Sequence, residues 1–494
     1  MDENVVFNSG QPNNQSSQPP VGEADTDPQQ ATPAEPAEGV DGEQLETTEE
    51  EEYVAPAGPL DFFKAHWWKF LVGILLLFFI LFLINLFSPK KAVTENVKLS
   101  WWGLWEDGPA MQAIIVDFEK EYPHIDIEYS KRSPQDYYEK VLSRIENGTG
   151  PDIFRYHNSW VPVLSDKLLP LPVDVIDPKE FKNNYYTVVQ KDLMKNNAIL
   201  GIPMGIDSLA MLTNTELFAN AGVNVPGNWN EFKKVAKQLT VKDAVNGKIK
   251  QAGAALGTYK NVQHAPDIIS LLYMQQGINL YTFEGKPENK ASALQFYTDF
   301  AKGTDNVWDE TLDNSLLAFS KGTLAIYFGY SWDVLTIQKL NKNIKFKVSP
   351  APMLTKPSTI ASYWVEGVSA KSKHQQEALL FMKHLAKKET AQKFYAETGK
   401  GRAFGEPYAR KDMRESLREE PLIYPFLAQL DEASSTIFSS DTHDGDTGLN
   451  TTLNKYLENA TNSVLYDGDT LQSINETIES GVAQVFKNYG ITKQ

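Results

Sequence analysis

The chain has 494 residues, with 64 acidic and 47 basic side chains and no cysteine. Its apolar content of 41% is enough for a large core, which excludes a chain that is disordered throughout. The net charge of −17 argues against a nucleic-acid-binding protein, and the lack of cysteine excludes disulfides, thiolate metal sites, cysteine nucleophiles and a lipid-modified cysteine anchor.

The negative charge is concentrated at the N-terminus. Residues 1–60 contain fourteen acidic side chains and no lysine or arginine, so residues 61–494 carry only −3. The segment is rich in Pro, Gln, Ala and Gly, and it cannot bury enough apolar surface to offset the entropy lost on ordering. We therefore predict a disordered acidic tail over 1–60. A solubilising spacer is favoured over an interaction arm, because charge runs are usually solvated.

An apolar segment follows the tail. Residues 70–87 are Leu, Ile, Val and Phe, interrupted only by Gly73 and Asn85. About twenty apolar residues in a helix span the hydrocarbon core of a membrane. Sixty polar residues precede the segment and no small-residue cleavage site follows it, unlike a signal peptide. The sequence predicts an uncleaved transmembrane anchor helix over 67–88.

From residue 97 onward, short apolar strands alternate with amphipathic helices, which is typical of an α/β domain. A capping box over 133–136 is expected to start the second helix, and Gly148 to end it. The expected strands are 97–102, 125–129, 152–154 and 324–328, and further helices are expected over 228–239, 373–387 and 469–490. A domain of this size is too large for a single simple core, so we expect two lobes.

Common catalytic motifs are absent from the sequence, including H-E-x-x-H, G-x-S-x-G, Walker A and G-x-G-x-x-G. Asp441, Asp444 and Asp446 lie around Gly445 in a weak likeness to a calcium loop. The EF-hand spacing and its closing glutamate are missing, so a surface turn is favoured. We expect no cofactor, no metal site and no catalytic residue.

Tryptophans follow several of the predicted strands. Trp105, Trp160 and Trp332 come shortly after strands, and ligands of α/β sheets bind beyond the carboxyl ends of strands. An indole ring suits the C–H face of a carbohydrate, whose hydroxyls need polar partners. Trp229 and Trp308 are expected to pack in the core.

Several motifs together resemble a known family. They are residues 118–123 with 125–127, 150–153, 200–203, 214–218 with Ala221-Gly222, 319–326 and 366–369. In this order and spacing, the sequence is similar to the extracellular solute-binding proteins of ABC importers. It resembles the family 1, sugar-type branch that includes maltose-binding protein, over about residues 97–490.

This resemblance implies a two-lobed, periplasmic-binding-protein-like (type II) α/β fold with three hinge crossings, near 206–209, 346–350 and 399–402. One lobe would hold residues 96–206 and 351–400, and the other 207–350 and 401–494. The implied ligand contacts are Trp105, Glu106, Tyr156, Ser159, Trp160, Asp207, Asn261, His264, Trp332 and Trp364. Asp207 would accept hydrogen bonds from sugar hydroxyls, and Trp332 would stack on the sugar. The loop after residue 153 departs from the family pattern, because it lacks the pair of polar residues that maltose-binding protein has there.

The expected function is that of a membrane-anchored, extracytoplasmic solute-binding protein. It would capture a carbohydrate, expected to be an oligosaccharide, and deliver it as a monomer to ABC permease subunits. The lysines that flank the apolar segment are balanced and do not decide its orientation. A receptor must meet solute outside, so residues 1–66 are expected in the cytoplasm and 90–494 outside. The alternatives are a non-sugar solute, a membrane-anchored glycan-processing enzyme and a sensor subunit.

Overall fold

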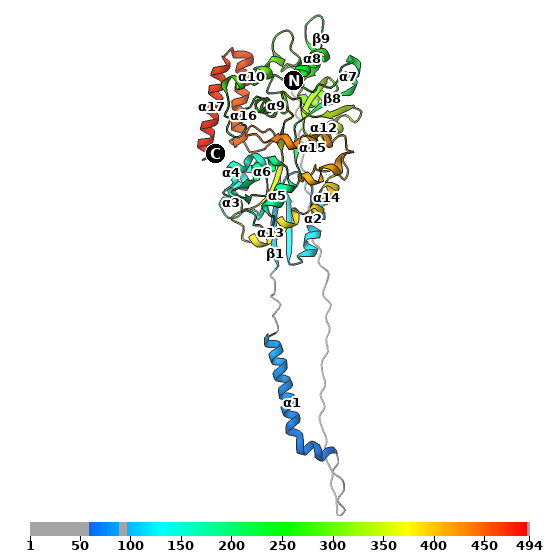
Figure 1. Ribbon diagram of the computed structural model, residues 1–494, viewed down its shortest axis with the longest axis vertical. Helices are drawn as coiled ribbons and strands as arrows, with labels where there is room; N and C mark the ends of the chain where they lie inside the picture. Colours follow the sequence, from blue (N-terminus) through cyan, green and yellow to red (C-terminus); the bar gives the residue numbers. More distant parts are fainter. Residues whose placement is uncertain (1–58, 88–95, 492–494) are drawn as a thin grey trace, which may run out of the picture. The chain divides into compact units, whose positions relative to one another are not determined.

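The computed structural model describes residues 59–87 and 96–491 (Figure 1). The chain divides into two compact units, Met1–Lys91 and Ala92–Gln494. The predicted acidic tail lies outside the described residues, except for its last two positions.

The first unit contains helix α1 (Pro59–Phe87), which covers most of the predicted anchor over 67–88 and begins before it. The side chains described in α1 are those of residues 67–83. All of these residues except Lys69 and Gly73 have large apolar side chains, and the segment is largely exposed. Among the helices of the described residues, none combines the length and the apolar character that crossing a membrane requires. The structure thus places a helix at the predicted position without supporting the predicted span.

The second unit contains two five-stranded sheets, one in each lobe. The first sheet has the order β2-β1-β3-β14-β6. Its strands are β1 (Val97–Gly103), β2 (Ile125–Lys131), β3 (Ile153–His157), β6 (Ile202–Pro203) and β14 (Trp364–Val368). β1, β2 and β3 run parallel, and β14 is antiparallel to both β3 and β6. The edge strand β2 buries Ile125 and Ile127 and exposes the alternating acids Asp126 and Glu128, whereas every residue of the central strand β3 is buried.

The second sheet has the order β12-β8-β11-β10-β9. Its strands are β8 (Ala210–Asn214), β9 (Val241–Lys242), β10 (Ile249–Ala254), β11 (Leu324–Gly329) and β12 (Phe346–Ser349). β10 and β11 are parallel, and β8 is antiparallel to β11 and β12. A helix passes so close to β10 that a Cβ added at Gly253 would overlap the carbonyl oxygen of Ala236. Glycine is therefore required there.

A third, small sheet lies where the chain passes between the two large ones. It has the order β15-β13-β7, made of β7 (Asp207–Ser208), β13 (Thr359–Ser362) and β15 (Ala433–Ser434). β7 lies between β6 and β8 in the chain, and β13 lies between β12 and β14. The predicted lobe boundaries stay a prediction. Arg410, beyond the predicted boundary at 400, still donates through a guanidinium nitrogen to the carbonyl of Ala386 in the first lobe, 2.8 Å away.

Helices cover the sheets (Figure 1). Those built around the first sheet are α2 (Gly108–Glu121), α3 (Tyr137–Glu146), α4 (Val161–Leu164), α5 (Pro178–Asn184), α6 (Thr187–Leu193), α13 (Gln375–Leu385) and α14 (Lys388–Thr398), with the hairpin β4 (Met194–Lys195) and β5 (Ala198–Ile199). The others are α7 (Thr215–Ala221), α8 (Trp229–Leu239), α9 (Ala265–Gln275), α10 (Pro287–Thr298), α11 (Ser315–Ser320), α12 (Ser331–Leu340), α15 (Tyr424–Ala428), α16 (Leu449–Asn462) and α17 (Leu471–Asn488). α16 and α17 pack side by side, and α17 contacts α10.

Of two helix N-terminal caps predicted from the sequence, one is confirmed and one is wrong. Asn228 caps α8 as predicted, since its side-chain oxygen accepts from the backbone N–H of Glu231 at 3.0 Å. The predicted capping box over 133–136 is wrong. Ser133 Oγ instead accepts from the N–H of Gln135, two residues on, and α3 begins only after Asp136, which has a left-handed φ of 56°. A serine can form such a local turn in place of a helix cap.

One carboxylate joins segments from both lobes. Asp192, near the end of α6, accepts hydrogen bonds from Tyr363 Oη at 2.6 Å, Tyr281 Oη at 2.8 Å, Asn158 Nδ2 at 3.3 Å and Ser435 Oγ. Asn158 follows β3 of the first lobe, whereas Tyr281 follows α9 of the second. Tyr363 and Ser435 follow β13 and β15 of the small sheet.

We predict that Asp192→Asn lowers the free energy of unfolding by about 1–3 kcal/mol, because an amide leaves hydroxyl donors without an acceptor. Urea unfolding of the purified protein measures this change. Tyr281→Phe removes one of the four donors at a partly exposed position, so it is the matched control and should cost less. An Asp192→Asn variant as stable as the unsubstituted protein would contradict the prediction.

Candidate ligand-binding cavity

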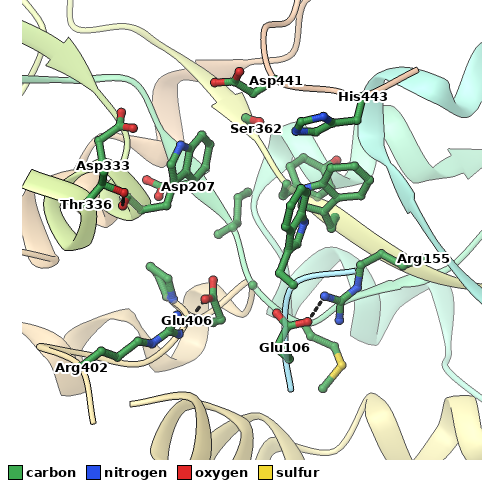
Figure 2. Close-up of a pocket in the computed structure, with 18 of the residues that line it drawn as sticks. Glu106, Arg155, Asp207, Asp333, Thr336, Ser362, Arg402, Glu406, Asp441 and His443 are labelled. Atoms are coloured by element: carbon green, nitrogen blue, oxygen red, sulfur yellow. Dashed lines mark hydrogen bonds and ion pairs between the residues drawn. The ribbon is translucent and has the colours of Figure 1, made fainter. Parts of the chain in front are cut away.

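A cavity of about 550 Å³ lies within the second unit (Figure 2). Its lining comes from the loop after β1, from β3 and β14 of the first sheet, from β7 and β13 of the small sheet, and from α12 of the second lobe. Further lining residues are Met204, Gly205, Ile206, Gln263, Leu316, Phe394, Arg402, Glu406, Pro407, Asp441 and His443. The cavity therefore lies between the two lobes, beside the strands that connect them.

Five of the ten predicted contact residues line this cavity. They are Trp105, Glu106, Asp207, Trp332 and Trp364. Trp105 and Trp332 are 39% and 36% exposed, which is unusual for indole rings in the middle of a folded domain and leaves their surfaces open to a ligand. Trp229 and Trp308 are buried in the core, which confirms that prediction.

The other five do not line it. Tyr156, Ser159, Trp160, Asn261 and His264 are all buried. Ser159 Oγ donates to Asn450 Oδ1 at 2.8 Å, and Trp160 packs edge-on against Trp364 with ring centroids 5.4 Å apart. In this arrangement they support the cavity wall, and their direct contact with a ligand stays a prediction.

Asn261 and Tyr156 are held by the protein itself. Asn261 Oδ1 accepts from Trp308 Nε1 at 3.1 Å, and its Nδ2 donates to the carbonyl of Asp309 at 2.9 Å. Tyr156 Oη donates to the carbonyl of Leu200 at 3.2 Å. These hydrogen bonds use the polar atoms that a ligand would otherwise need.

The indole rings are fixed by other aromatic rings. Trp105 and Trp364 meet edge to face with centroids 5.5 Å apart. Trp332 stacks on Tyr330 at 4.3 Å with an interplanar angle of 15°. Such pairs add about 0.5–1.5 kcal/mol beyond their buried area. Because the rings are already oriented, binding need not order them.

A buried ion-pair cluster positions Glu106. Arg155 on β3 and Glu366 on β14 are directly opposite in the strand register, and Arg155 Nε donates to Glu366 Oε1 at 2.7 Å. A second guanidinium nitrogen of Arg155 pairs with Glu106. Trp101 Nε1 also donates to Glu366, at 2.8 Å. All three charged side chains are less than 10% exposed. The guanidinium group of Arg155 is therefore neutralised by carboxylates of the protein itself.

Asp207 links the first crossing strand to the helix that carries Trp332. Its Oδ1 accepts from the N–H of Ser208, and its Oδ2 from the N–H of Ser331 in the first turn of α12, each at 2.7 Å. Burial raises the pKa of Asp207 to about 8, against the lowering effect of these N–H donors. The carboxyl group thus both lines the cavity and holds α12 in place.

His264 lies behind Trp332 at the centre of an acidic cluster. Its Nε2 is 2.7 Å from Asp333 Oδ2, and its Nδ1 is 2.9 Å from Ser440 Oγ, 3.5 Å from Asp441 Oδ2 and 3.9 Å from Asp267 Oδ2. Burial lowers the pKa of His264, but the carboxylates, Asp333 above all, outweigh it and raise that pKa to about 9. The imidazole is therefore protonated at neutral pH.

Several ionisable cavity residues were not found from the sequence. They are Arg155, Asp333, Arg402, Glu406, Asp441 and His443. The three aspartates around Gly445 were the signal for Asp441, but they were interpreted as a surface turn. Asp444 is in fact buried and accepts from the N–H of Asn450 at 2.6 Å, which anchors the turn and directs Asp441 and His443 to the cavity (Figure 2). Residues 59–87 and 96–491 contain no group of three or more acidic or histidine side chains arranged to hold a metal ion.

The His264 cluster predicts a pH-dependent stability. Because the pKa of His264 is about 9 in the folded state against 6.5 ordinarily, its ion pairs stabilise the fold fully below pH 6.5, and this contribution is lost as pH rises through 9. We predict that His264→Gln loses less stability over this range than the unsubstituted protein, by about 1–3 kcal/mol.

Chemical unfolding at a series of pH values measures this difference. His374→Gln, at the start of α13 and outside the cluster, is the control and should follow the unsubstituted protein. Parallel stability curves for His264→Gln and the unsubstituted protein would contradict the assignment.

Comparison with known proteins places the chain in a family. A family model described as "Bacterial extracellular solute-binding protein" matches residues 102–392. The "Multiple sugar-binding protein" of Streptococcus mutans is 22% identical over 354 residues, which cover 68% of this chain and 81% of that protein.

Solved structures share the fold. A cyclo/maltodextrin-binding protein complexed with maltotetraose has a TM-score of 0.64 at 18% identity, over 82% of this chain and all of that one. The cyclic alpha-maltosyl-1,6-maltose binding protein of Arthrobacter globiformis has a TM-score of 0.63 at 18% identity, over 79% of this chain and 99% of that one. Together with the family match over more than half of its length, this two-lobed fold shows that the chain belongs to the bacterial extracellular solute-binding proteins.

Proposed function

We propose that the protein captures a carbohydrate in the cavity between its lobes and delivers it to an ABC permease. The observation that carries the proposal is the cavity itself, where three oriented indole rings and several carboxyl groups surround about 550 Å³. Apolar ring faces suit the C–H faces of sugars, and carboxylates accept hydrogen bonds from hydroxyls. The names of the Streptococcus relative and of the two solved structures, all sugar binders, support the same ligand class.

The proposed mechanism is reversible closure of the two lobes. Trp105 and Trp364 come from the first lobe and Trp332 from the second, so a ligand that contacts all three favours the arrangement in which the lobes are close. Hinge movement at the crossing strands would open the cavity. The closed form would then dock on the permease and release the ligand there. We propose that binding proceeds without chemical change, as expected for a binding protein and not for an enzyme.

A panel of saccharides tests the proposed ligand class. A ligand present at 100 times its Kd raises the free energy of unfolding by about 2.7 kcal/mol, which a thermal-shift screen of the purified protein detects. Product analysis of each bound saccharide separates binding from hydrolysis. Stabilisation by an amino acid, peptide or phosphate ester, with none by any saccharide, would contradict the proposal.

We predict that Trp332→Ala weakens binding of a saccharide found in that panel by about tenfold or more, because the stacking surface is lost. The ring is partly exposed, so the fold should be retained. Isothermal titration calorimetry measures the Kd. Tyr466→Ala is the matched control, because Tyr466 is an exposed aromatic residue that does not line the cavity. An unchanged Kd in Trp332→Ala would show that the ligand binds elsewhere.

We also propose that α1 anchors the protein in the cell membrane, with residues 1–66 in the cytoplasm and 90–494 outside. The support is the row of exposed Leu, Ile and Phe side chains over 71–82, whose contact with water is unfavourable. We predict that alkaline carbonate leaves the protein in the membrane pellet, and that protease added to intact spheroplasts degrades the binding domain. Release by carbonate, or full protection from protease with a control outer-face protein digested, would contradict the anchor or its orientation.

A further inference from the structure

We propose that the cavity selects a saccharide that carries a basic amino group and rejects acidic saccharides. This inference rests on the proposed function and narrows its ligand class. It follows from the balance of charges around the cavity, from the way each cation is used, and from the indole faces.

Carboxyl groups outnumber cations in the cavity wall. Among the described residues, the lining carboxyl groups are those of Glu106, Asp207, Asp333, Glu406 and Asp441, and the lining guanidinium groups are those of Arg155 and Arg402. Figure 2 shows them on several sides of the cavity, with Asp207 and Asp333 on one side, Asp441 on another, and Glu106 and Glu406 on a third. Burial raises the pKa of Asp207 to about 8, so this group carries little charge near pH 6, and the negative charge that a ligand meets comes from the other lining acids.

The guanidinium charges are already matched inside the protein. Arg155 pairs with both Glu106 and the buried Glu366. Arg402 pairs with Glu406, with an N–O distance of 2.6 Å. The Nε–H of Arg402 is buried and has no hydrogen-bond partner among the described residues. A carboxylate or phosphate on a ligand would have to compete with Glu406 for that charge.

The imidazolium of His264, behind the cavity wall, is shared by three acidic side chains. His264 lies within 4 Å of Asp333, Asp441 and Asp267, and burial raises the pKa of Asp267 to about 6, so the imidazolium is shared mainly between Asp333 and Asp441. Asp441 has the most exposed side chain of the lining acids, at 38%, which makes it the carboxylate that a ligand cation reaches most easily. A charge-assisted hydrogen bond to it is stronger than a neutral one.

The position of Asp441 is built into the fold. Its backbone has a left-handed φ of 52°, and the preceding Ser440 is held by the ring of His264 and, through its N–H, by Asp267 at 3.3 Å. Asp441, Arg402 and Glu406 all lie beyond residues 102–392, the part that the family model matches. Asp441, the most exposed of the lining acids, thus comes from outside that matched part.

The aromatic walls add to the preference. Trp105 and Trp332 present partly exposed rings to the cavity, and the face of an indole attracts a cation. The same surface repels an anion that approaches over the ring. Carboxylates and ring faces therefore favour one sign of charge.

A matched pair of saccharides tests this inference by calorimetry on the purified protein. The pair is cellotetraose and the tetramer of glucosamine with the same linkage, in which ammonium groups replace hydroxyls. At about pH 6 and low salt we expect the glucosamine tetramer to bind about tenfold more tightly. Added salt should reduce that difference. A galacturonic acid tetramer should show no binding.

Asp441→Asn is the decisive variant, because asparagine tolerates the left-handed backbone and keeps the size of the side chain. It should reduce the preference for the glucosamine tetramer, and Asp446→Asn, in the same turn but off the cavity lining, should not. Equal or tighter binding of cellotetraose overturns the inference and leaves the proposed function standing. Binding of the galacturonic acid tetramer also overturns the inference, as does a failure of both cellotetraose and the glucosamine tetramer to bind. The thermal-shift screen of saccharides then tests the proposed function separately.

Discussion

The small sheet β15-β13-β7 is the constraint on which the rest of this molecule depends. It lies where the chain passes between the two large sheets, so the lobes meet beside it and the cavity forms there. Asp207 in β7 shows how closely the connection and the site are joined. One carboxyl group lines the cavity, accepts from its own strand and accepts from the first turn of α12. A movement of this crossing strand must therefore move the helix that carries Trp332.

The same region couples the cavity to more distant segments. Tyr363 lines the cavity, and its hydroxyl donates to Asp192, which also accepts from Tyr281 of the second lobe. His264 connects α12, through Asp333, to the turn that presents Asp441. In both cases a buried charged or polar group holds together segments that are far apart in the sequence. Such groups must be fully paired, since an unpaired buried charge is strongly destabilising.

Local pattern predicted much of the fold. The alternation in β2, the asparagine cap of α8 and the positive φ of Gly148 follow from rules that act within a few residues. The capping box at Ser133 failed, because the serine had a competing local hydrogen bond that its sequence pattern does not reveal.

The candidate site was only half predictable. Trp105, Asp207 and Trp332 were expected from the family resemblance, and the structure brings them to one cavity. Arg155 was missed because its partner Glu366 is 211 residues away, and an arginine inside a buried strand has no local signature. His264 was expected to contact the ligand. In the structure its side chain is buried and paired with Asp333, and it does not line the cavity. The net charge of −17 comes mostly from residues 1–60, so it gives no information about the charge around the cavity.

The most direct test of the central claim is a distance between the lobes, measured with and without a saccharide. The chain has no cysteine, so spin labels can be placed at Lys140→Cys on α3 and Lys237→Cys on α8 without a competing thiol. Pulsed electron paramagnetic resonance then reports the separation of the two lobes. We predict a broad distribution of distances without ligand, and a narrower, shifted one with a saccharide that binds. An identical distribution in the presence of a saturating saccharide would contradict capture by lobe closure.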